Sequence, residues 1–178
     1  MPILSIIEVP HPTLAKNARP VREDEFGPAL EEHLASMAET MYAAPGVGLA
    51  GPQVNDSRRI LVIDPGNDSA DNSDNSDQTH LLAIVNPEIK RRSRETVMWE
   101  ESCLSLPEFY VKVKRFVSID VSWQDAMGHH HSKTFDGFPA IILQHEMDHL
   151  EGVTLLQKSS RLKRSRYLAK KKKDNVTQ

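Results

Sequence analysis

The sequence predicts an α+β fold in which small antiparallel sheets surround one buried helix, with one outer helix and a basic helix at the C-terminal end. Two observations support this class. Several short runs are apolar and β-branched with turn residues around them, as is typical of short strands. Residues 137–152 are apolar almost all round, which indicates a helix buried on every side. At 178 residues, the chain has an ordinary size for a single core.

The first third of the chain predicts a strand, a helix and a loop. The opening MPILSIIEVPHP has no basic segment and no long apolar run, so we interpret it as a first strand rather than a signal peptide and expect a cytoplasmic protein. Leucine and methionine recur at helical spacing over residues 27–43, which predicts an amphipathic helix with its apolar stripe on the core. In APGVGLAGPQV, glycine and proline are too dense for a regular helix, so a loop or irregular strand should follow.

Four further segments predict strands. RRILVID and LLAIVNPEI are apolar and β-branched, with Pro65 and Pro87 as their expected boundaries. FVSIDVSW and HHHSKTF should pair as a hairpin through the turn QDAMG, with the three adjacent histidines 129–131 exposed on it. The polar segment at 66–79 lacks the sixth-position glycine and twelfth-position glutamate of a calcium loop, so we expect a solvated insertion there.

The segment GFPAIILQHEMDHLEG predicts a helix of about 13 residues, because Pro139 lies near its first turn and Gly152 follows its end. His145 and His149 are four residues apart, so both imidazoles lie on one helical face and can meet one ion. Glu146 is displaced around the helix and can reach a water without ligating that ion. Burying these polar groups costs on the order of several kcal/mol unless they are paired or ligated, so we predict a metal-binding helix.

A catalytic metal site has three protein ligands and one open position. Beyond Glu151 the sequence has no histidine, and its only acid is Asp174, so the third ligand should lie upstream. Cys103 is the sole cysteine and the first candidate, because a buried thiolate binds iron or zinc strongly. The alternative third ligands are His80, Asp120 and Glu101.

Three stretches, GVGLAGPQ (46–53), EESCLSLP (100–107) and QHEMDHLEG (144–152), follow one another in the order and at about the separations seen in peptide deformylases. With the opening ILSIIEVPHPTL, the resemblance covers nearly the whole chain. It implies a metal-dependent hydrolase that removes the formyl group from the N-terminal formyl-methionine of newly made polypeptides and releases formate. The chain departs from the common family pattern at Gly51, Ser102 and Tyr110, where alanine, glycine and arginine are frequent.

The resemblance also implies which residues hold the metal. Cys103, His145 and His149 would be its ligands, and Glu146 would be the general acid and base. The implied ion is ferrous iron, which zinc, nickel or cobalt can replace. A thiolate with two imidazoles accepts each of these ions.

Further roles follow from the same resemblance. The side chain of Gln53 and the backbone N–H of Leu104 would stabilise the developing oxyanion, and Glu101 would orient His145. Four more residues would contact the substrate, through the backbone of Gly48 and through a methionine pocket formed by Val47, Phe138 and Ile141.

Basic side chains are concentrated at the end of the chain. Residues 158–178 carry nine Lys or Arg and one acid, which leaves 13 basic and 24 acidic side chains in residues 1–157. We therefore expect a catalytic domain at 1–157 and a basic C-terminal extension at 158–178, which could form a helix with Leu162, Tyr167 and Leu168 as its apolar contacts. The extension is either a solvated tail or, as the resemblance implies, a contact to the ribosome through RNA phosphates.

Two other functions remain open at this level. A zinc endopeptidase would need a third ligand downstream of the helix, where the sequence has no obvious candidate. A non-catalytic, metal-stabilised RNA-binding protein would use the basic extension but has no need of Glu146 beside the ligands. No apolar run approaches the roughly 20 residues that span a bilayer, so we expect no membrane partner.

Overall fold

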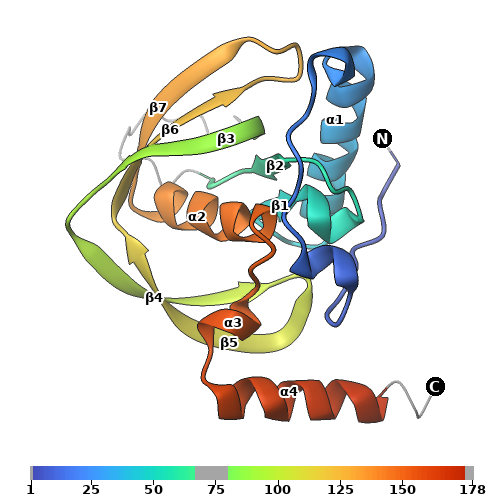
Figure 1. Ribbon diagram of the computed structural model, residues 1–178, viewed down its shortest axis with the longest axis vertical. Helices are drawn as coiled ribbons and strands as arrows, with labels where there is room; N and C mark the ends of the chain where they lie inside the picture. Colours follow the sequence, from blue (N-terminus) through green and yellow to red (C-terminus); the bar gives the residue numbers. More distant parts are fainter. Residues whose placement is uncertain (1, 67–79, 175–178) are drawn as a thin grey trace.

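Two antiparallel sheets lie on either side of one helix in the computed structural model, which describes residues 2–66 and 80–174 (Figure 1). The larger sheet has the order β1-β2-β3-β6-β7, with β1 (Gly48–Ala50), β2 (Ile60–Ile63), β3 (Leu82–Arg92), β6 (Ser118–Gln124) and β7 (His130–Asp136). The smaller sheet is a hairpin of β4 (Thr96–Cys103) and β5 (Leu106–Phe116). This architecture confirms the predicted α+β class. From residue 67 onward, the insertion predicted at 66–79 lies outside the described residues.

The helix between the sheets is α2 (Phe138–Leu150), the helix predicted to be buried. It follows Gly137, whose φ of 62° suits glycine, and has Pro139 in its first turn. Ile142, Leu143 and Leu150 pack into the main core against the larger sheet. The opposite side of α2 faces the β4–β5 hairpin, as Figure 1 shows. The helix therefore contributes to the core on one side and presents its polar groups to the hairpin on the other.

The outer helix is α1 (Pro28–Ala43), which begins one residue after the range of 27–43 that the leucine and methionine spacing predicts. Its buried stripe of Leu30, Leu34, Met37 and Met41 packs against β1 and β2 in a second apolar cluster. The loop between α1 and β2 is thereby fixed on the core. That loop contains the short strand β1 and the 3-10 turn η3 (Gly51–Val54).

The prediction of an N-terminal strand is wrong. The described residues from 2 to 9 run without a strand partner, although three of their N–H groups donate hydrogen bonds. Ile7 donates to the carbonyl of Gln53 at 2.8 Å, Val9 to the carbonyl of Ser105 at 3.1 Å, and Leu4 to the hydroxyl of Thr40. Because the acceptors belong to three different segments, no ladder forms. The N-terminal segment instead ties η3 to the turn of the β4–β5 hairpin.

The strand β3 continues past Pro87, which was expected to end it. The register to β6 shifts between Val85 and Glu88, and Asn86 has a φ of 51°. A bulge accommodates a proline within a sheet, because the missing N–H is not needed there. The β4–β5 hairpin was not predicted, because charged residues interrupt the apolar pattern of both TVMWEESC and VKVKRF, although only two residues connect the strands.

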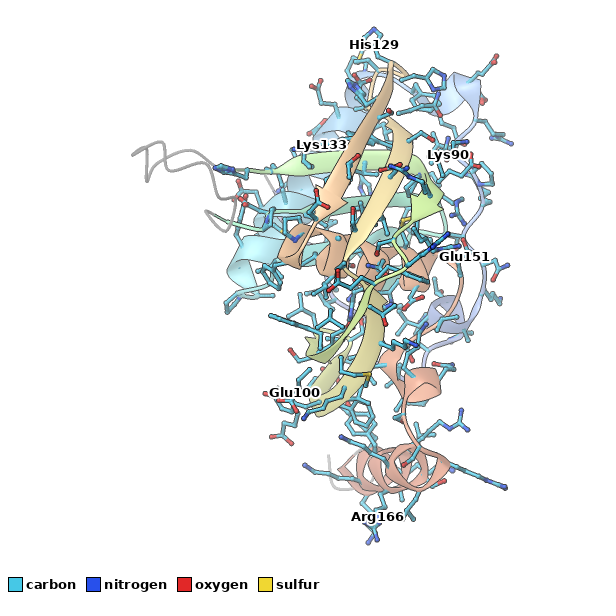
Figure 2. All side chains as sticks on the ribbon, turned by 90° about the vertical axis from the view of Figure 1, so that its left-hand side faces the viewer. Lys90, Glu100, His129, Lys133, Glu151 and Arg166 are labelled. Atoms are coloured by element: carbon cyan, nitrogen blue, oxygen red, sulfur yellow. The ribbon has the colours of Figure 1, made fainter. Side chains whose placement is uncertain are left out.

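The chain ends in two helices, α3 (Leu155–Lys158) and α4 (Arg161–Asp174). Figure 2 shows α4 at one end of the molecule, next to the β4–β5 hairpin. Tyr167 is only 9% exposed, with its ring centroid 4.9 Å from that of Phe109, and Leu168 packs beside it. The predicted basic helix is present, but Leu162 is 61% exposed and does not contribute the expected contact.

Gly152 should be required where α2 ends. Its φ is +67°, and a Cβ there would lie 2.9 Å from backbone atoms of Ala15 and Lys16. Gly66 has the same φ but no atom within 4 Å of its Cβ position, so it is a matched control. We expect Gly66→Ala to lower the free energy of unfolding by about 1 kcal/mol through backbone strain alone, and Gly152→Ala by about 2–4 kcal/mol. Chemical denaturation followed by circular dichroism measures both, and equal losses would contradict the close approach.

Candidate active site

Three potential metal ligands converge beside α2. His145 and His149 lie one turn apart on the helix, and Cys103 is at the end of β4. Their ligand atoms all lie within 4.8 Å of one another, and the Sγ of Cys103 is 3.2 Å from the Nε2 of His149. Among residues 2–66 and 80–174, this is the only such group of three. Of the candidates for the third ligand, the fold thus brings Cys103 to the histidines and leaves His80 and Asp120 apart from them.

The chemistry of this group fits a divalent transition metal. One thiol and two imidazoles are ligands that zinc and iron accept. Burial lowers the pKa of His149 well below its ordinary value, which favours the neutral imidazole that binds metals. The Oε2 atom of Glu146 is buried and has no hydrogen-bond partner in the described part of the chain. Such unpartnered polar atoms are rare in protein interiors, so this one calls for a partner such as a water or an ion.

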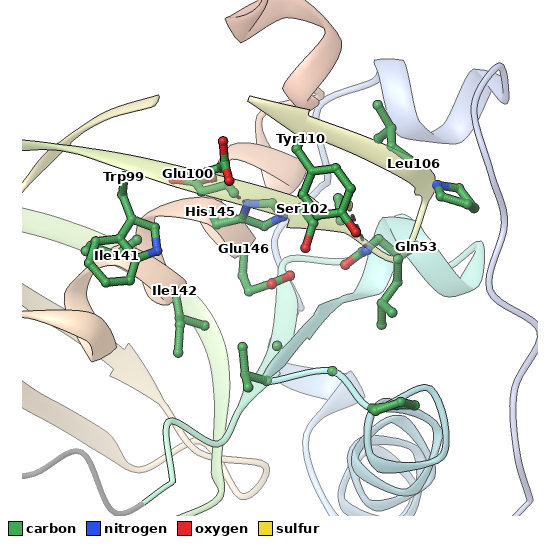
Figure 3. A pocket seen from close by; sticks show the side chains of 18 of the residues that line it. Gln53, Trp99, Glu100, Ser102, Leu106, Tyr110, Ile141, Ile142, His145 and Glu146 are labelled. Carbon is green, nitrogen blue, oxygen red and sulfur yellow. Dashed lines mark hydrogen bonds and ion pairs between the residues drawn. The ribbon is translucent and has the colours of Figure 1, made fainter. Parts of the chain in front are cut away.

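Glu146 points from α2 into the pocket shown in Figure 3. It is 4% exposed, and burial raises the pKa of its carboxyl to about 7. A Cβ at Gly48 would lie 2.4 Å from its Oε1 atom, so only glycine leaves room for the carboxylate at this point of β1. The carboxylate therefore lies directly against the backbone of β1.

Gln53 lies on η3, beside the ligand group. Its Oε1 accepts a hydrogen bond from the N–H of Ala50 at 2.8 Å, which fixes the orientation of the amide. The Nε2 then faces Cys103, 3.6 Å from its Sγ, and Ser105, 3.3 Å from its Oγ. Leu104, which follows the cysteine, lines the same pocket. The fold thus places both predicted oxyanion donors near the metal ligands.

A buried ion pair positions His145, one of the three potential metal ligands. Its Nδ1 lies 2.8 Å from the carboxylate of Glu101, so its other ring nitrogen is left for a metal. Arg115 binds the same carboxylate through two hydrogen bonds of 2.6 and 2.8 Å and also binds Asp148 at 2.6 Å. Burial alone would raise the pKa of Glu101, but the hydrogen bonds from Arg115 and His145 outweigh it and hold that pKa at about 2.

Sequence reasoning missed Arg115 and Asp148. The alternation of Val111, Val113 and Arg115 in VKVKRF places the arginine on the buried side of a strand. This signal was available but needed β5 to be recognised. Asp148 lies within the QHEMDHLEG stretch, on the same helix as the ligands, and its partner Arg115 could not be identified without the tertiary fold.

The pocket that opens over the ligand group has a volume of about 450 Å³. Val47, Phe138 and Ile141, predicted to hold the methionine side chain, all line it. Trp99 completes this wall with its ring centroid 5.9 Å from that of Phe138, and sequence reasoning missed it. Ile142 also lines this part of the pocket. The result is a mostly apolar hollow that ends at the potential metal ligands.

The three departures from the common family pattern lie outside the ligand group. A Cβ at Gly51 would come within 2.9 Å of the carbonyl oxygen of Arg58 and of a side-chain carbon of Ile60, so glycine fits here and alanine would require a shift. Ser102 and Tyr110 are exposed at the mouth of the pocket. These substitutions change the loop and the rim and leave the identities of Cys103, His145 and His149 intact.

Comparison with known proteins identifies relatives over almost the full length. The family model described as "Polypeptide deformylase" matches residues 3–165. The peptide deformylase of Erythrobacter litoralis is 40% identical and that of Novosphingobium aromaticivorans 42%, each match covering 97% of both chains. The crystal structure of peptide deformylase from Thermotoga maritima matches with a TM-score of 0.80 and 37% identity over 90% of this chain and 99% of that chain. The structure from Ehrlichia chaffeensis gives 0.87 and 32% over 99% and 98%.

Arg115 should be more important for stability than other arginines of the chain. Its side chain and that of Glu101 are 4% and 5% exposed, so Arg115→Gln leaves a buried carboxylate without its partner. We expect a loss of about 3 kcal/mol or more in the free energy of unfolding. Arg19 makes an equally short two-bond pair with Glu25 on the surface, and Arg19→Gln should change stability little. Urea denaturation compares the two, and similar losses would contradict this role of burial.

Proposed function

Because the chain belongs to the peptide deformylase family, whose members remove the formyl group from the N-terminus of nascent peptides, we propose how its residues carry out this reaction. The chain is accordingly a metal-dependent hydrolase of this family. One observation supports the roles proposed below. The ligand atoms of Cys103, His145 and His149 lie within 4.8 Å of one another, in a pocket that Glu146 and Gln53 also line.

The proposed ligands are Cys103, His145 and His149, with Glu101 orienting His145. When bound there, a divalent ion supplies Lewis acidity for activating water and polarising a carbonyl group. We propose ferrous iron, with zinc, nickel or cobalt as the ions that the same ligands could hold. Metal analysis of protein purified without oxygen distinguishes them.

Glu146 is the proposed general acid and base. Its carboxylate takes a proton from the attacking water and later delivers it to the leaving nitrogen. The water oxygen bonds to the formyl carbon and the carbon–nitrogen bond breaks, so formate and a free methionine amine are released. A carboxyl with a pKa raised toward 7 is suited to both transfers near neutral pH. Its place against the backbone of Gly48 limits its movement between them.

Gln53 and Leu104 are the proposed donors to the formyl oxygen as negative charge develops on it. The amide oxygen of Gln53 is held by the N–H of Ala50, which fixes the amide plane, and the N–H that lies against Cys103 would turn to the formyl oxygen. Donors of this kind contribute about 3 kcal/mol each to transition-state stabilisation. The backbone N–H of Leu104 would act from the other side of Cys103.

The substrate is proposed to lie extended across the pocket, with its methionine side chain against Val47, Phe138 and Ile141. These apolar walls fit an unbranched thioether side chain. The backbone of Gly48 would pair with that of the peptide, as strand addition requires. Only the first side chain needs a pocket of its own, because the scissile bond is at the end of the peptide.

Three wider proposals concern the setting of the enzyme. We propose a catalytic domain at 1–157 and a basic extension at 158–178, which would contact the ribosome through α4. We also propose a cytoplasmic location, because the substrate is a nascent chain. No helix in the described ranges has both the length and the apolar character needed to cross a membrane.

Formate release tests the proposed reaction directly. With formyl-Met-Ala as the substrate, we expect formate and a free amine in equal amounts. A chelator should abolish release, and adding ferrous iron without oxygen should restore it, because the three ligands hold the ion that supplies Lewis acidity. Casein should remain intact, since an endopeptidase function is not expected. Full activity in metal-free protein would contradict the proposal.

Glu146→Gln should separate catalysis from metal binding. The amide neither takes up nor delivers the proton, so kcat should fall at least about 100-fold while the metal content is unchanged. Glu100→Gln is the matched control, because Glu100 lines the same pocket but is exposed on β4. It should retain nearly all activity. A Glu146→Gln enzyme with the wild-type rate would show that another group moves the proton.

A further inference from the structure

The basic side chains of this protein fall into paired and unpaired sets. Most cations of the larger sheet and its loops form ion pairs, as Arg58 does with Asp56 and Arg59 with Glu151. The Lys and Arg side chains for which the described residues provide no carboxylate partner gather mainly in two places. They are Arg92, Arg94, Lys112 and Lys114 around the β3–β4 bend and β5, and Arg161, Lys163, Arg164, Arg166 and Lys172 on α4. Elsewhere in the described ranges, only Lys16 and Lys133 lack such a partner.

Two hollows meet at Arg92. One, of about 470 Å³, lies at the β3–β4 bend and is lined by Arg91, Arg92 and Arg94 together with Ser93, Ser118 and Asp120. The other, of about 490 Å³, lies between α2 and β5 and includes Arg92, Lys114 and Lys158. The guanidinium of Arg92 lies over the ring of Phe116, 5.7 Å from its centroid. The two hollows are therefore parts of one basic surface.

The acids of these hollows are already neutralised. Asp120 binds Arg91 at 2.7 Å, and Glu151 binds Arg59 at 2.7 Å. Asp148 binds Arg115 and Lys158, and Glu88 binds Lys90. Arg92, Arg94 and Lys114 form no ion pair with any of these carboxylates. A polyanion could thus bind these cations without breaking an existing ion pair to a carboxylate.

The strand β5 connects this surface to α4. Lys112 and Lys114 are both exposed and alternate with buried residues, so they project from the same face. Near the middle of β5, Lys163 of α4 donates a hydrogen bond to the carbonyl of Tyr110, and at the end of the strand Phe116 lies beneath Arg92. Six residues of strand span roughly 20 Å. Figure 2 shows the β4–β5 hairpin between α4, marked by Arg166, and the bend near Lys90.

Resting on the ribosome contact proposed above for α4, we propose that the RNA-binding surface extends onto the rest of the chain through Arg92, Arg94, Lys112 and Lys114. These four residues and the cations of α4 named above are here called the basic band. Arginine guanidinium groups suit phosphate oxygens, which they bind through two N–H groups. A projecting sugar-phosphate backbone can enter hollows of this size, whereas a flat anionic membrane cannot follow them. The band binds through phosphates and therefore without sequence readout. It provides an attachment that is independent of the catalytic pocket.

Fluorescence anisotropy with a labelled RNA hairpin of about 20 base pairs tests the band at several salt concentrations. Arg94→Gln/Lys114→Gln removes two unpaired cations of the band. Lys16→Gln/Lys133→Gln removes two unpaired cations elsewhere and is matched in charge. Losing two phosphate contacts should reduce the slope of log K against log salt by about 1.8 and weaken binding roughly 30-fold at about 0.15 M salt. The control pair should leave both quantities at the wild-type values.

Two further variants sharpen the test. Arg94→Lys/Lys114→Arg keeps both charges and should retain most of the affinity. Arg161→Gln/Arg164→Gln in α4 should lower the slope again when combined with the band variant, because the two parts act on one RNA. Substitution is better than truncation here, since Tyr167 is buried and its loss would open the core.

Folding and activity provide the remaining controls. Thermal unfolding and formate release from formyl-Met-Ala should be unchanged in the band variant, because neither Arg94 nor Lys114 lines the catalytic pocket. The proposal is overturned if the band and control variants bind RNA equally well. It is also overturned if the band variant loses binding to phosphatidylserine vesicles but keeps its affinity for RNA, which would show that the surface is a membrane contact.

Discussion

The buried ion pair between Glu101 and Arg115 is the interaction on which the site depends. It joins β4 to β5, and each partner also reaches α2, through His145 and Asp148 respectively. Two buried charges are costly unless all their hydrogen-bonding capacity is used, and here both partners have further bonds. The hairpin carries Cys103 and the helix carries the histidines, so a shift between the two layers would expose or unpair these charges. The network therefore holds the ligands of two layers in one geometry.

A second constraint comes from the loop after α1. Because Gly48 lacks a side chain, the carboxylate of Glu146 can lie directly against β1, and Gln53 approaches from the adjoining turn. The apolar stripe of α1 packs against this loop, and the N-terminal segment donates a hydrogen bond to the carbonyl of Gln53. Both contacts fix the loop. The site is thus assembled from three separate elements, and each is anchored by packing that lies outside the pocket. Because this packing anchors the three elements, the pocket can be open and still remain ordered.

The sequence predicted the elements that are determined by residues close together in the chain. Apolar periodicity predicted α1, and proline and glycine placed the ends of α2, because helices depend on residues a few positions apart. The bulge at Pro87 and the role of Arg115 depend on partners in other elements, so no local pattern revealed them. The β4–β5 hairpin is local, but charged side chains interrupt the apolar alternation of both of its strands. The residues alone also left the third ligand open between Cys103 and three alternatives. Only the resemblance to a family and then the fold itself brought the cysteine to the histidines.

Net charge along the chain gives a different view of the surface than ion pairing does. The composition assigns the positive charge to the last 21 residues and leaves the rest with an excess of acids. In the fold, however, Asp120, Asp148 and Glu151 are bound by other cations, so these three carboxylates are not available to Arg94 or Lys114. Salt screens charges over a Debye length of about 8–10 Å, so a phosphate backbone responds only to the charges close to it. Whether a nearby cation is already ion-paired therefore decides which part of the surface attracts the phosphates. The basic surface therefore extends from α4 onto the body that carries the active site.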